Sequence, residues 1–277
     1  MKPDALDFPK VCHLFWDGFP MSVYHVFTVI SFHKQNPQWE IIVWLSKQKY
    51  HQLGQNTFVG QYHGQDHFEL LRGLPYVQIK EVDLEEWGIN TGIPSCSSSD
   101  IFRMLVLYKF GGVYSDFDVL WIKPISYLLY VSHIGFYSPA TACVCFHEYL
   151  KGFQNVSIMV AKPNSTYLAD IIDLQKSVKP PYEHQSYGSA LISQRYPDLG
   201  TVLSEGHKVV ALKYETFYPY SVYSLDKLFQ HTDLSCLGPA IGVHWFCGHK
   251  DTLAFLNSPI QKGNSFLRII QTLVNNV

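Results

Sequence analysis

Residues 97–122 have the sequence SSSDIFRMLVLYKFGGVYSDFDVLWI, which predicts a helix, a tight turn and a strand in succession. The serines favour a helix start, and apolar residues follow at helical spacing: Ile101, Phe102, Leu105 and Tyr108. The pair Gly111-Gly112 predicts the end of that helix. Residues 113–122 are mostly apolar and predict a strand that Pro124 closes.

Strands and helices alternate along the rest of the chain. Apolar strands are predicted at residues 11–16 and 39–45, with a helix at 21–34 between them. This order predicts a parallel sheet covered by helices. Residues 54–75 lack periodicity and indicate a loop or short helices. Further strands are predicted at 76–82, 156–161, 209–212 and 241–246, and further helices at 165–176, 189–195 and 265–274. Because no linker separates these elements, we expect a single α/β domain over residues 1–277.

Composition argues against several classes of protein. Lys and Arg number 21 against 23 Asp and Glu, a net charge of −2, which makes a nucleic-acid partner unlikely. The chain shows neither a signal peptide nor an apolar run of about 18 residues, so we expect a soluble, cytoplasmic protein without a transmembrane segment. Six cysteines in 277 residues argue against a disulfide scaffold. Cys143, Cys145 and His147 lie closer together than the ligands of structural zinc sites, so buried or loop thiols are favoured there.

Two carboxylates stand out in the strand predicted at 113–122. Side chains alternate along a strand, so Asp116 and Asp118 point to the same face with their Cβ atoms about 7 Å apart. Burying both requires a positive partner, and Mg²⁺ or Mn²⁺ prefers such oxygen ligands. Solvated carboxylates, or carboxylates paired with Lys or Arg, are the alternative. Asp100 and Arg103 share a face of the preceding helix, where an N-cap and a surface ion pair are their ordinary roles.

The motif Ser99-Asp100-x-x-Arg103-x-x-x-Leu107-x-x-x-Gly111-Gly112-Val113-Tyr114-x-Asp116-x-Asp118 resembles the DXD sugar-transferase family. This family includes the initiating α-1,6-mannosyltransferase and the catalytic domain of the large clostridial glucosylating toxins. Weaker matches are Pro9-Lys10-x-x-His13-x-x-Trp16-x-Gly18, Asn36-Pro37-x-Trp39-x-x-x-x-Trp44 and Gly242-Val243-His244-Trp245. The resemblance implies a GT-A fold, with a Rossmann-like, mostly parallel central sheet and helices on both faces.

The resemblance also implies site residues. It assigns catalytic roles to Asp100, Arg103, Asp116 and Asp118, and the metal, Mn²⁺ or Mg²⁺, to Asp116, Asp118 and His244. Asp100 and Arg103 would bind donor sugar hydroxyls, and Trp16 would stack on the base. Asp116 would contact the ribose or a metal-bound water, and the nucleotide-sugar contacts are completed by Phe15, Tyr114, Phe117, Asn155 and Gly188. Two departures from the family pattern concern the acceptor side and the loop over the diphosphate: Tyr187-Gly188-Ser189 lacks a proline, and Trp245-Phe246-Cys247-Gly248 replaces Ser-Trp.

The implied activity is glycan biosynthesis by a metal-dependent, retaining glycosyltransferase. It would move a hexose from a nucleotide diphosphate sugar to a glycan or another hydroxyl acceptor. A UDP-sugar is the first expectation for the donor and GDP-mannose the second. Two other classes fit an Asp-x-Asp pair: a phosphatase of the haloacid dehalogenase type, whose pair usually lies near the N-terminus, and a non-catalytic sugar-binding module.

Overall fold

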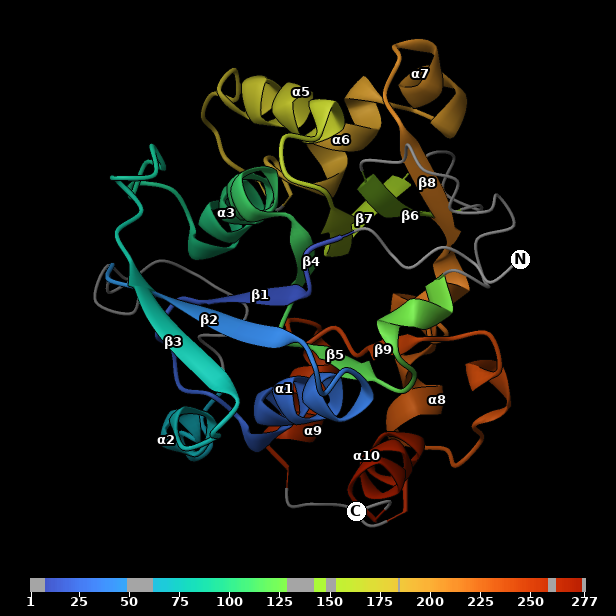
Figure 1. Cartoon of the computed structure of the whole chain (residues 1–277). Coiled ribbons are helices and arrows are strands. Elements are labelled where there is room, and N and C mark those ends of the chain that lie inside the picture. The colour runs from blue at the N-terminus through green and yellow to red at the C-terminus, as the bar shows by residue number, and fades with distance from the viewer. Residues whose placement is uncertain are drawn as a thin grey trace.

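A mostly parallel sheet runs through the centre of the protein (Figure 1). The computed structural model describes residues 8–48, 62–128, 142–147, 153–183, 185–258 and 263–275. Within these ranges seven strands pair in the order β3-β2-β1-β4-β7-β6-β8. Only β7 runs antiparallel to its neighbours in that sheet. The strands are β1 (Val11–Trp16), β2 (Glu40–Ser46), β3 (Val77–Val82), β4 (Gly112–Ser115), β6 (Ala142–His147), β7 (Phe153–Ala161) and β8 (Val209–Lys213).

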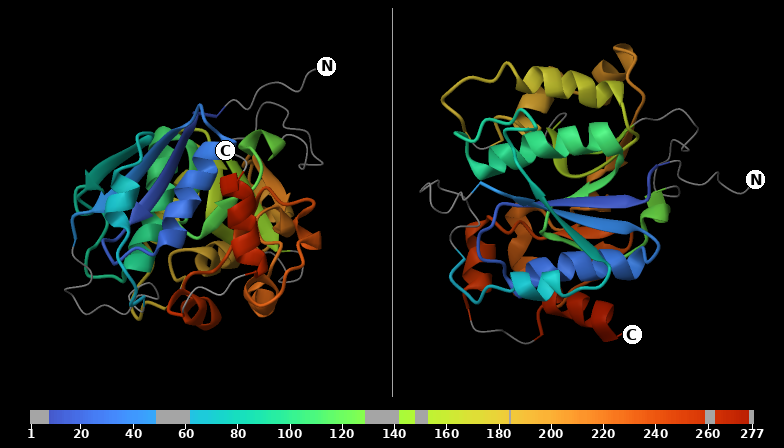
Figure 2. Two further views of the ribbon diagram at one scale, coloured as in Figure 1. Left: turned by 90° about the horizontal axis from the view of Figure 1, so that it is seen from below. Right: turned by 60° about the vertical axis from the view of Figure 1, so that its left-hand side comes forward.

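Helices cover both faces of this sheet, as predicted (Figure 2). On one face lie α3 (Ser95–Phe110), α5 (Thr166–Gln175), α6 (Ser189–Arg195) and α7 (Leu199–Ser204). On the other lie α1 (Val23–Gln35), α2 (Phe68–Arg72), α8 (Leu225–Phe229), α9 (Lys250–Leu256) and α10 (Ser265–Asn275). Within the described ranges, none of these helices combines the length and the apolar character needed to cross a lipid bilayer.

The burial of strand β1 explains why helices cover both faces of the sheet. All six of its residues are buried, and successive side chains enter opposite cores. Val11 and Phe15 pack in the core beneath α3, whereas Cys12, Leu14 and Trp16 pack in the core that contains α1. A continuous apolar run is typical of a parallel strand that is buried on both faces.

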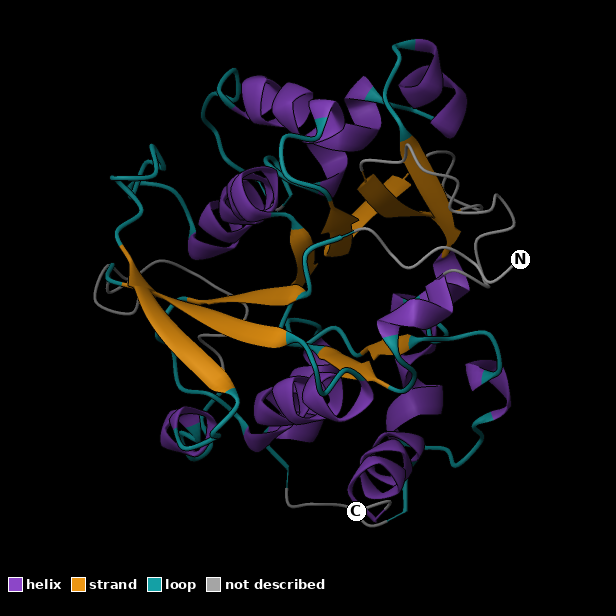
Figure 3. Cartoon of the chain, viewed as in Figure 1, coloured by secondary structure: helices purple, strands orange, loops and turns teal. Residues whose placement is uncertain are grey.

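A second, two-stranded sheet pairs β5 (Val119–Trp121) antiparallel with β9 (Gly242–His244), seen below the main sheet in Figure 3. The prediction of a single strand at 113–122 is therefore wrong, because the chain turns at residues 116–118 between β4 and β5. Asp116 N still donates to Ser157 O of β7 at 2.8 Å, but Trp245 N donates to Asp118 O at 2.9 Å, next to β9. Thr28 Oγ1 holds the intervening Phe117 carbonyl at 2.6 Å. These long-range hydrogen bonds direct the chain out of the main sheet and into the two-stranded sheet.

Helix α3 begins earlier than predicted. It starts at Ser95, and Ser98 N already donates to Pro94 O at 3.0 Å. Asp100 therefore lies inside the helix and is not an N-cap. The predicted strand at 241–246 is also shorter and spans only Gly242–His244. In the region predicted as a loop or short helices, α2 supplies a short helix, and residues 49–61 lie outside the described residues.

The glycine pair after α3 is fixed from two sides. Gly111 and Gly112 have φ angles of +66° and +93°, which glycine adopts most readily. The Gly111 carbonyl accepts a hydrogen bond from His13 Nε2 at 3.1 Å, and Trp44 Nε1 donates to His13 Nδ1 at 3.2 Å. Burial lowers the pKa of His13 to about 4, so the ring is neutral at pH 7 and can serve both partners. His13 and Trp44 thus support the turn that leads into the Asp-x-Asp segment.

Gly112→Ala is expected to lower the free energy of unfolding by more than about 3 kcal/mol, because a Cβ there would lie 2.4 Å from the Val11 carbonyl oxygen. Gly206→Ala is the matched control. Its φ is also positive, at +83°, but a Cβ would meet open space among the described residues, so the loss should be about 1 kcal/mol. Urea unfolding followed by tryptophan fluorescence measures both variants. Equal losses would contradict the close-approach argument.

Candidate active site

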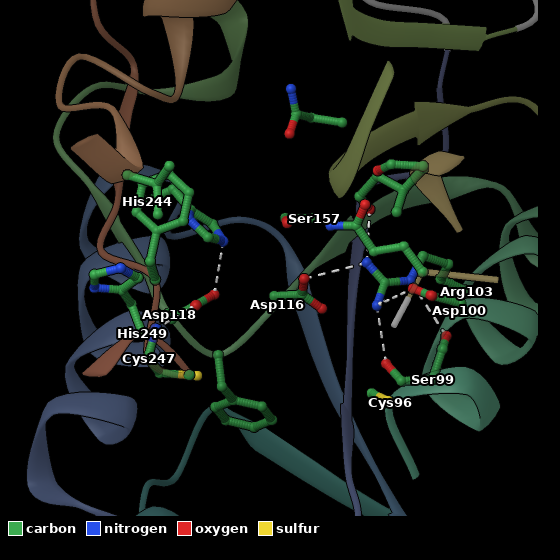
Figure 4. A pocket seen from close by; sticks show the side chains of 18 of the residues that line it. Cys96, Ser99, Asp100, Arg103, Asp116, Asp118, Ser157, His244, Cys247 and His249 are labelled. Carbon is green, nitrogen blue, oxygen red and sulfur yellow. Dashed lines mark hydrogen bonds and ion pairs between the residues drawn. The ribbon is translucent and has the colours of Figure 1, made fainter. Parts of the chain in front are cut away.

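The break between β4 and β5 opens onto a cavity of ≈ 630 Å³ (Figure 4). Its walls come from parts of the chain that are far apart in sequence. They include the end of β1, the first turns of α3, the turn at residues 116–118, residues 155–157 of β7, residues 214–223, and the segment that follows β9. The cavity lies beside the C-terminal ends of the parallel strands β1 and β4, where ligands of open α/β sheets bind.

Arg103 links α3 to the Asp-x-Asp turn. Its side chain is 5% exposed, and each of its five N–H groups has a partner. Nη2 lies 3.0 Å from Asp100 Oδ1 and donates to Ser99 Oγ at 3.1 Å, and Nε donates to the Ser99 carbonyl at 3.3 Å. Nη1 donates to Asp116 Oδ2 at 3.1 Å and to the Val156 carbonyl at 2.8 Å. The guanidinium therefore holds two carboxylates in fixed positions.

Burial determines the protonation of the carboxylates around Arg103. It raises the pKa of Asp100 to about 6, although the adjacent guanidinium of Arg103 opposes the rise. Burial likewise raises the pKa of Asp116, again against the effect of Arg103. Burial would lower the pKa of Arg103 itself, but contacts with Asp116, Tyr114 and Asp100 hold it above its ordinary value. Arg103 is therefore charged throughout the physiological range.

Asp118 lies in a different environment at the other end of the turn. His244 Nε2 approaches its Oδ1 to 3.1 Å, and the Cys247 backbone N–H donates to its Oδ2 at 2.8 Å. Burial by itself would raise the pKa of Asp118, but His244 and the Cys247 N–H hold it well below its usual range. The register of the small sheet creates this contact, because Val119 of β5 pairs with His244 of β9. Asp118 is thus an ionised, buried carboxylate at neutral pH.

The residues predicted to bind the metal converge. One ligand atom from each of Asp116, Asp118 and His244 lies within 4.8 Å of the other two. Asp118 Oδ1 is buried and has no well-directed hydrogen bond among the described residues, in spite of its close approach to His244. Two carboxylate oxygens and an imidazole nitrogen suit Mn²⁺ or Mg²⁺. This donor set therefore fits a divalent cation.

Of the nine residues predicted to contact the nucleotide sugar, seven line the cavity and two do not. The lining residues are Phe15, Trp16, Asp100, Arg103, Asp116, Phe117 and Asn155. Tyr114 is fully buried. The Arg103 guanidinium carbon lies 4.7 Å from the centre of the Tyr114 ring, and the Tyr114 hydroxyl lies 2.9 Å from Ser99 Oγ. A Cβ on Gly188 would lie 2.5 Å from Asp100 Oδ2. Tyr114 and Gly188 therefore support the Asp100–Arg103 pair from behind and do not face the cavity.

The central part of the chain matches a known family. Residues 22–135 match the family described as "Glycosyltransferase sugar-binding region containing DXD motif". The segment includes Asp100, Arg103 and both aspartates of the turn, so the resemblance seen in the sequence is confirmed. No curated protein matches the chain at a significant level.

Solved glycosyltransferases share the fold. The chain is similar to the apo form of the glycosyltransferase GlyE from Streptococcus pneumoniae TIGR4, with a TM-score of 0.52, 11% identity, and coverage of 96% of this chain and 60% of that chain. It is similar to the apo structure of the bifunctional glycosyltransferase WbbM, with a TM-score of 0.51, 11% identity, and coverage of 98% and 50%. A third similar structure is the PaToxG glycosyltransferase, with a TM-score of 0.45, 15% identity, and coverage of 72% and 74%.

The protein has the fold of the GT-A glycosyltransferases. Its predicted fold class is confirmed by the sheet and by these similarities.

Several cavity residues were not predicted as site residues from the sequence. Cys247 contacts Asp118, and Tyr218, Val222 and Tyr223 also line the cavity. Each lies about 100 residues or more from the aspartates, and none belongs to a periodic motif. The Cys143-x-Cys145-x-His147 segment forms part of β6, and its side chains lie outside what the structure describes.

Asp100 should make the stability of the protein depend on pH. Its pKa in the folded state, about 6, exceeds the value of 3.8 for a free aspartate, so its protonated form favours folding. Its contribution to the free energy of unfolding is present below pH 4 and is lost as the pH rises through about 6. Relative to Asp100→Asn, the wild type should lose up to about 3 kcal/mol between pH 4 and pH 7.5. Urea unfolding of both proteins across this range measures the difference, and a constant difference would contradict the assignment.

Proposed function

We propose that this protein is a metal-dependent, retaining glycosyltransferase. It moves a hexose from a nucleotide diphosphate sugar, first a UDP-sugar and second GDP-mannose, to a hydroxyl of a glycan or another acceptor. The observation that carries the proposal is the convergence of Asp116, Asp118 and His244 beside the Asp100–Arg103 pair in one cavity. The match to a DXD glycosyltransferase region and the GT-A fold support this activity over a phosphatase.

The charge of the cavity supports the need for a cation. Among the described lining residues, four are aspartates: Asp17, Asp100, Asp116 and Asp118. Arg103 is the sole lysine or arginine among them, and its N–H groups are already engaged. A nucleoside diphosphate brings further negative charge into this acidic space. Its binding therefore requires a positive charge that the described side chains do not supply.

Mn²⁺ or Mg²⁺ is the proposed cation. Asp116, Asp118 and His244 would hold it, with Asp118 kept ionised by its contacts to His244 and Cys247. When bound, the ion offsets the negative charge that develops on the departing diphosphate. The Cys247 N–H and the β5–β9 register keep Asp118 in place.

The remaining roles follow from position. Asp100 would accept hydrogen bonds from donor sugar hydroxyls, and Asn155 also lines the cavity. Trp16, whose indole donates to the Phe19 carbonyl at 2.9 Å, would present its face to the base. For Arg103 we propose a role other than the predicted binding of sugar hydroxyls. With all five N–H groups engaged, it would act by orienting Asp100 and Asp116.

Asp118→Asn is expected to lower transfer by about 100-fold or more, because an amide is a weaker metal ligand than a carboxylate. The assay is release of nucleoside diphosphate from UDP-hexoses and GDP-mannose over a Mn²⁺ titration, and the bound ion is counted by electron paramagnetic resonance. Asp173→Asn, on the exposed surface of α5, is the matched control and should behave as the wild type. Proton NMR of the product tests retention of the anomeric configuration. Full turnover by Asp118→Asn in a chelator, or an inverted product, would exclude the corresponding part of the proposal.

Arg103→Lys should lower kcat by about tenfold or more while the charge is conserved, because an ammonium cannot bridge two carboxylates and a carbonyl in the same geometry. If Arg103 orients the carboxylates, Mn²⁺ affinity should fall along with kcat, since Asp116 loses its fixed position. Titration calorimetry with Mn²⁺ measures that affinity. A lower kcat with unchanged metal affinity would point to direct sugar binding by Arg103.

A further inference from the structure

One exposed aromatic residue lies at the cavity and has no role in the fold. Tyr223 is 87% exposed, the most exposed of the large hydrophobic side chains in the described part of the chain. The others are Leu70, Phe110, Tyr127 and Leu203, and of these five only Tyr223 lines the cavity. Single exposed apolar residues are common, but an exposed ring at the mouth of a cavity is placed where a ligand can contact it.

Hydrogen bonds fix the backbone turn that carries Tyr223. Tyr223 lies in a short 3₁₀ helix, η5 (Val222–Ser224), in which Ser224 N donates to the Ser221 carbonyl at 2.9 Å and Ser221 N donates to Ser224 Oγ at 3.0 Å. On either side of this turn, Tyr220 and Leu225 are buried. The Tyr220 hydroxyl donates to the Asp233 carbonyl at 2.9 Å. The turn is anchored at both ends, so a ligand that binds here has little further backbone to order.

Two further tyrosines line the cavity next to the predicted metal ligand His244. The Tyr218 ring lies 5.1 Å from that of His244 and stacks on Tyr214 at 4.6 Å with an interplanar angle of 14°. Both tyrosines line the cavity together with Val222 and Tyr223. Figure 4 shows His244 on one side of the cavity and Arg103 and Asp100 on the other, with Asp116 between them. Because its ring contacts His244, Tyr218 lies on the side opposite the proposed donor-sugar residues.

We propose that Tyr223, with Val222 and Tyr218, forms the acceptor subsite, and that it takes a neutral saccharide. The apolar face of a sugar ring packs well on a flat aromatic ring. The excess of aspartates among the described lining residues disfavours an acidic acceptor. A saccharide that contacts Tyr218 would lie close to the metal ligands, because the Tyr218 ring is 5.1 Å from that of His244. The assignment rests on the proposed transferase function and names the class of its acceptor.

The transfer step at this subsite balances without a further reactant. The hydroxyl oxygen of the saccharide forms a bond to the anomeric carbon of the donor hexose. The bond from that carbon to the diphosphate oxygen breaks, and the diphosphate takes the electron pair. The hydroxyl proton passes to the released diphosphate or to the solvent.

The test uses the full chain with Mn²⁺, the four donors UDP-glucose, UDP-galactose, UDP-N-acetylglucosamine and GDP-mannose, and the neutral disaccharides lactose, maltose and cellobiose. A disaccharide that contains glucuronic acid is the anionic comparison. We expect elongation of at least one neutral disaccharide, detected by mass. Tyr223→Ala should raise its KM by about tenfold and lower the ratio of transfer to donor hydrolysis by a similar factor, whereas Tyr223→Phe should change KM less than about twofold because it keeps the ring.

Two controls separate the possible outcomes. Tyr127→Ala removes another exposed tyrosine, 44% exposed and outside the cavity lining, and should leave KM unchanged. Saturation-transfer NMR in UDP and Mg²⁺ measures disaccharide binding independently of turnover. The inference is overturned if Tyr223→Ala keeps the wild-type KM, if Tyr223→Phe loses as much as Tyr223→Ala, if the acidic disaccharide is preferred, or if the donor is hydrolysed while no neutral disaccharide binds or is elongated. Absence of both transfer and hydrolysis with every donor would instead reject the transferase function on which the inference rests.

Discussion

The buried guanidinium of Arg103 connects the parts of this protein that form its cavity. Removing such a charge from water is unfavourable unless every N–H group finds an acceptor. Here the acceptors come from its own helix, from the Asp-x-Asp turn and from β7. The positions of α3, the turn and β7 are thereby tied to one another. Loss of one carboxylate partner leaves the charge uncompensated, which is why a polar group in the site also affects the stability of the fold.

The turn between the two sheets separates two neighbouring aspartates into different environments. Asp116 faces Arg103, and burial raises its pKa. Asp118, two residues on, faces His244 and the Cys247 N–H, and its pKa is held low. A continuous strand would have placed both carboxylates on the main sheet, away from β9. The break is what brings an imidazole nitrogen to within reach of both carboxylates and completes a donor set suited to a divalent cation.

The same geometry divides the cavity into two sides. Carboxylates held by Arg103 occupy one side, and Tyr218 and the Tyr214 ring stacked on it lie next to His244 on the other. A donor with a charged diphosphate and a neutral acceptor with an apolar ring face make different demands on a binding surface. In the proposed assignment the carboxylate side meets the first demand and the tyrosines meet the second.

The sequence by itself determined the order and type of most elements, since helical and strand periodicity are local properties. It also identified the Asp-x-Asp pair and the shared helix face of Asp100 and Arg103, which depend on spacings of two and three residues. His244 was predicted only through a family resemblance. The strand break, the use of all five Arg103 N–H groups, the Cys247 contact and the place of Tyr223 were decided by the tertiary structure. These features depend on partners tens to more than a hundred residues apart, whose approach is set by sheet register and packing, and local periodicity carries no information about either.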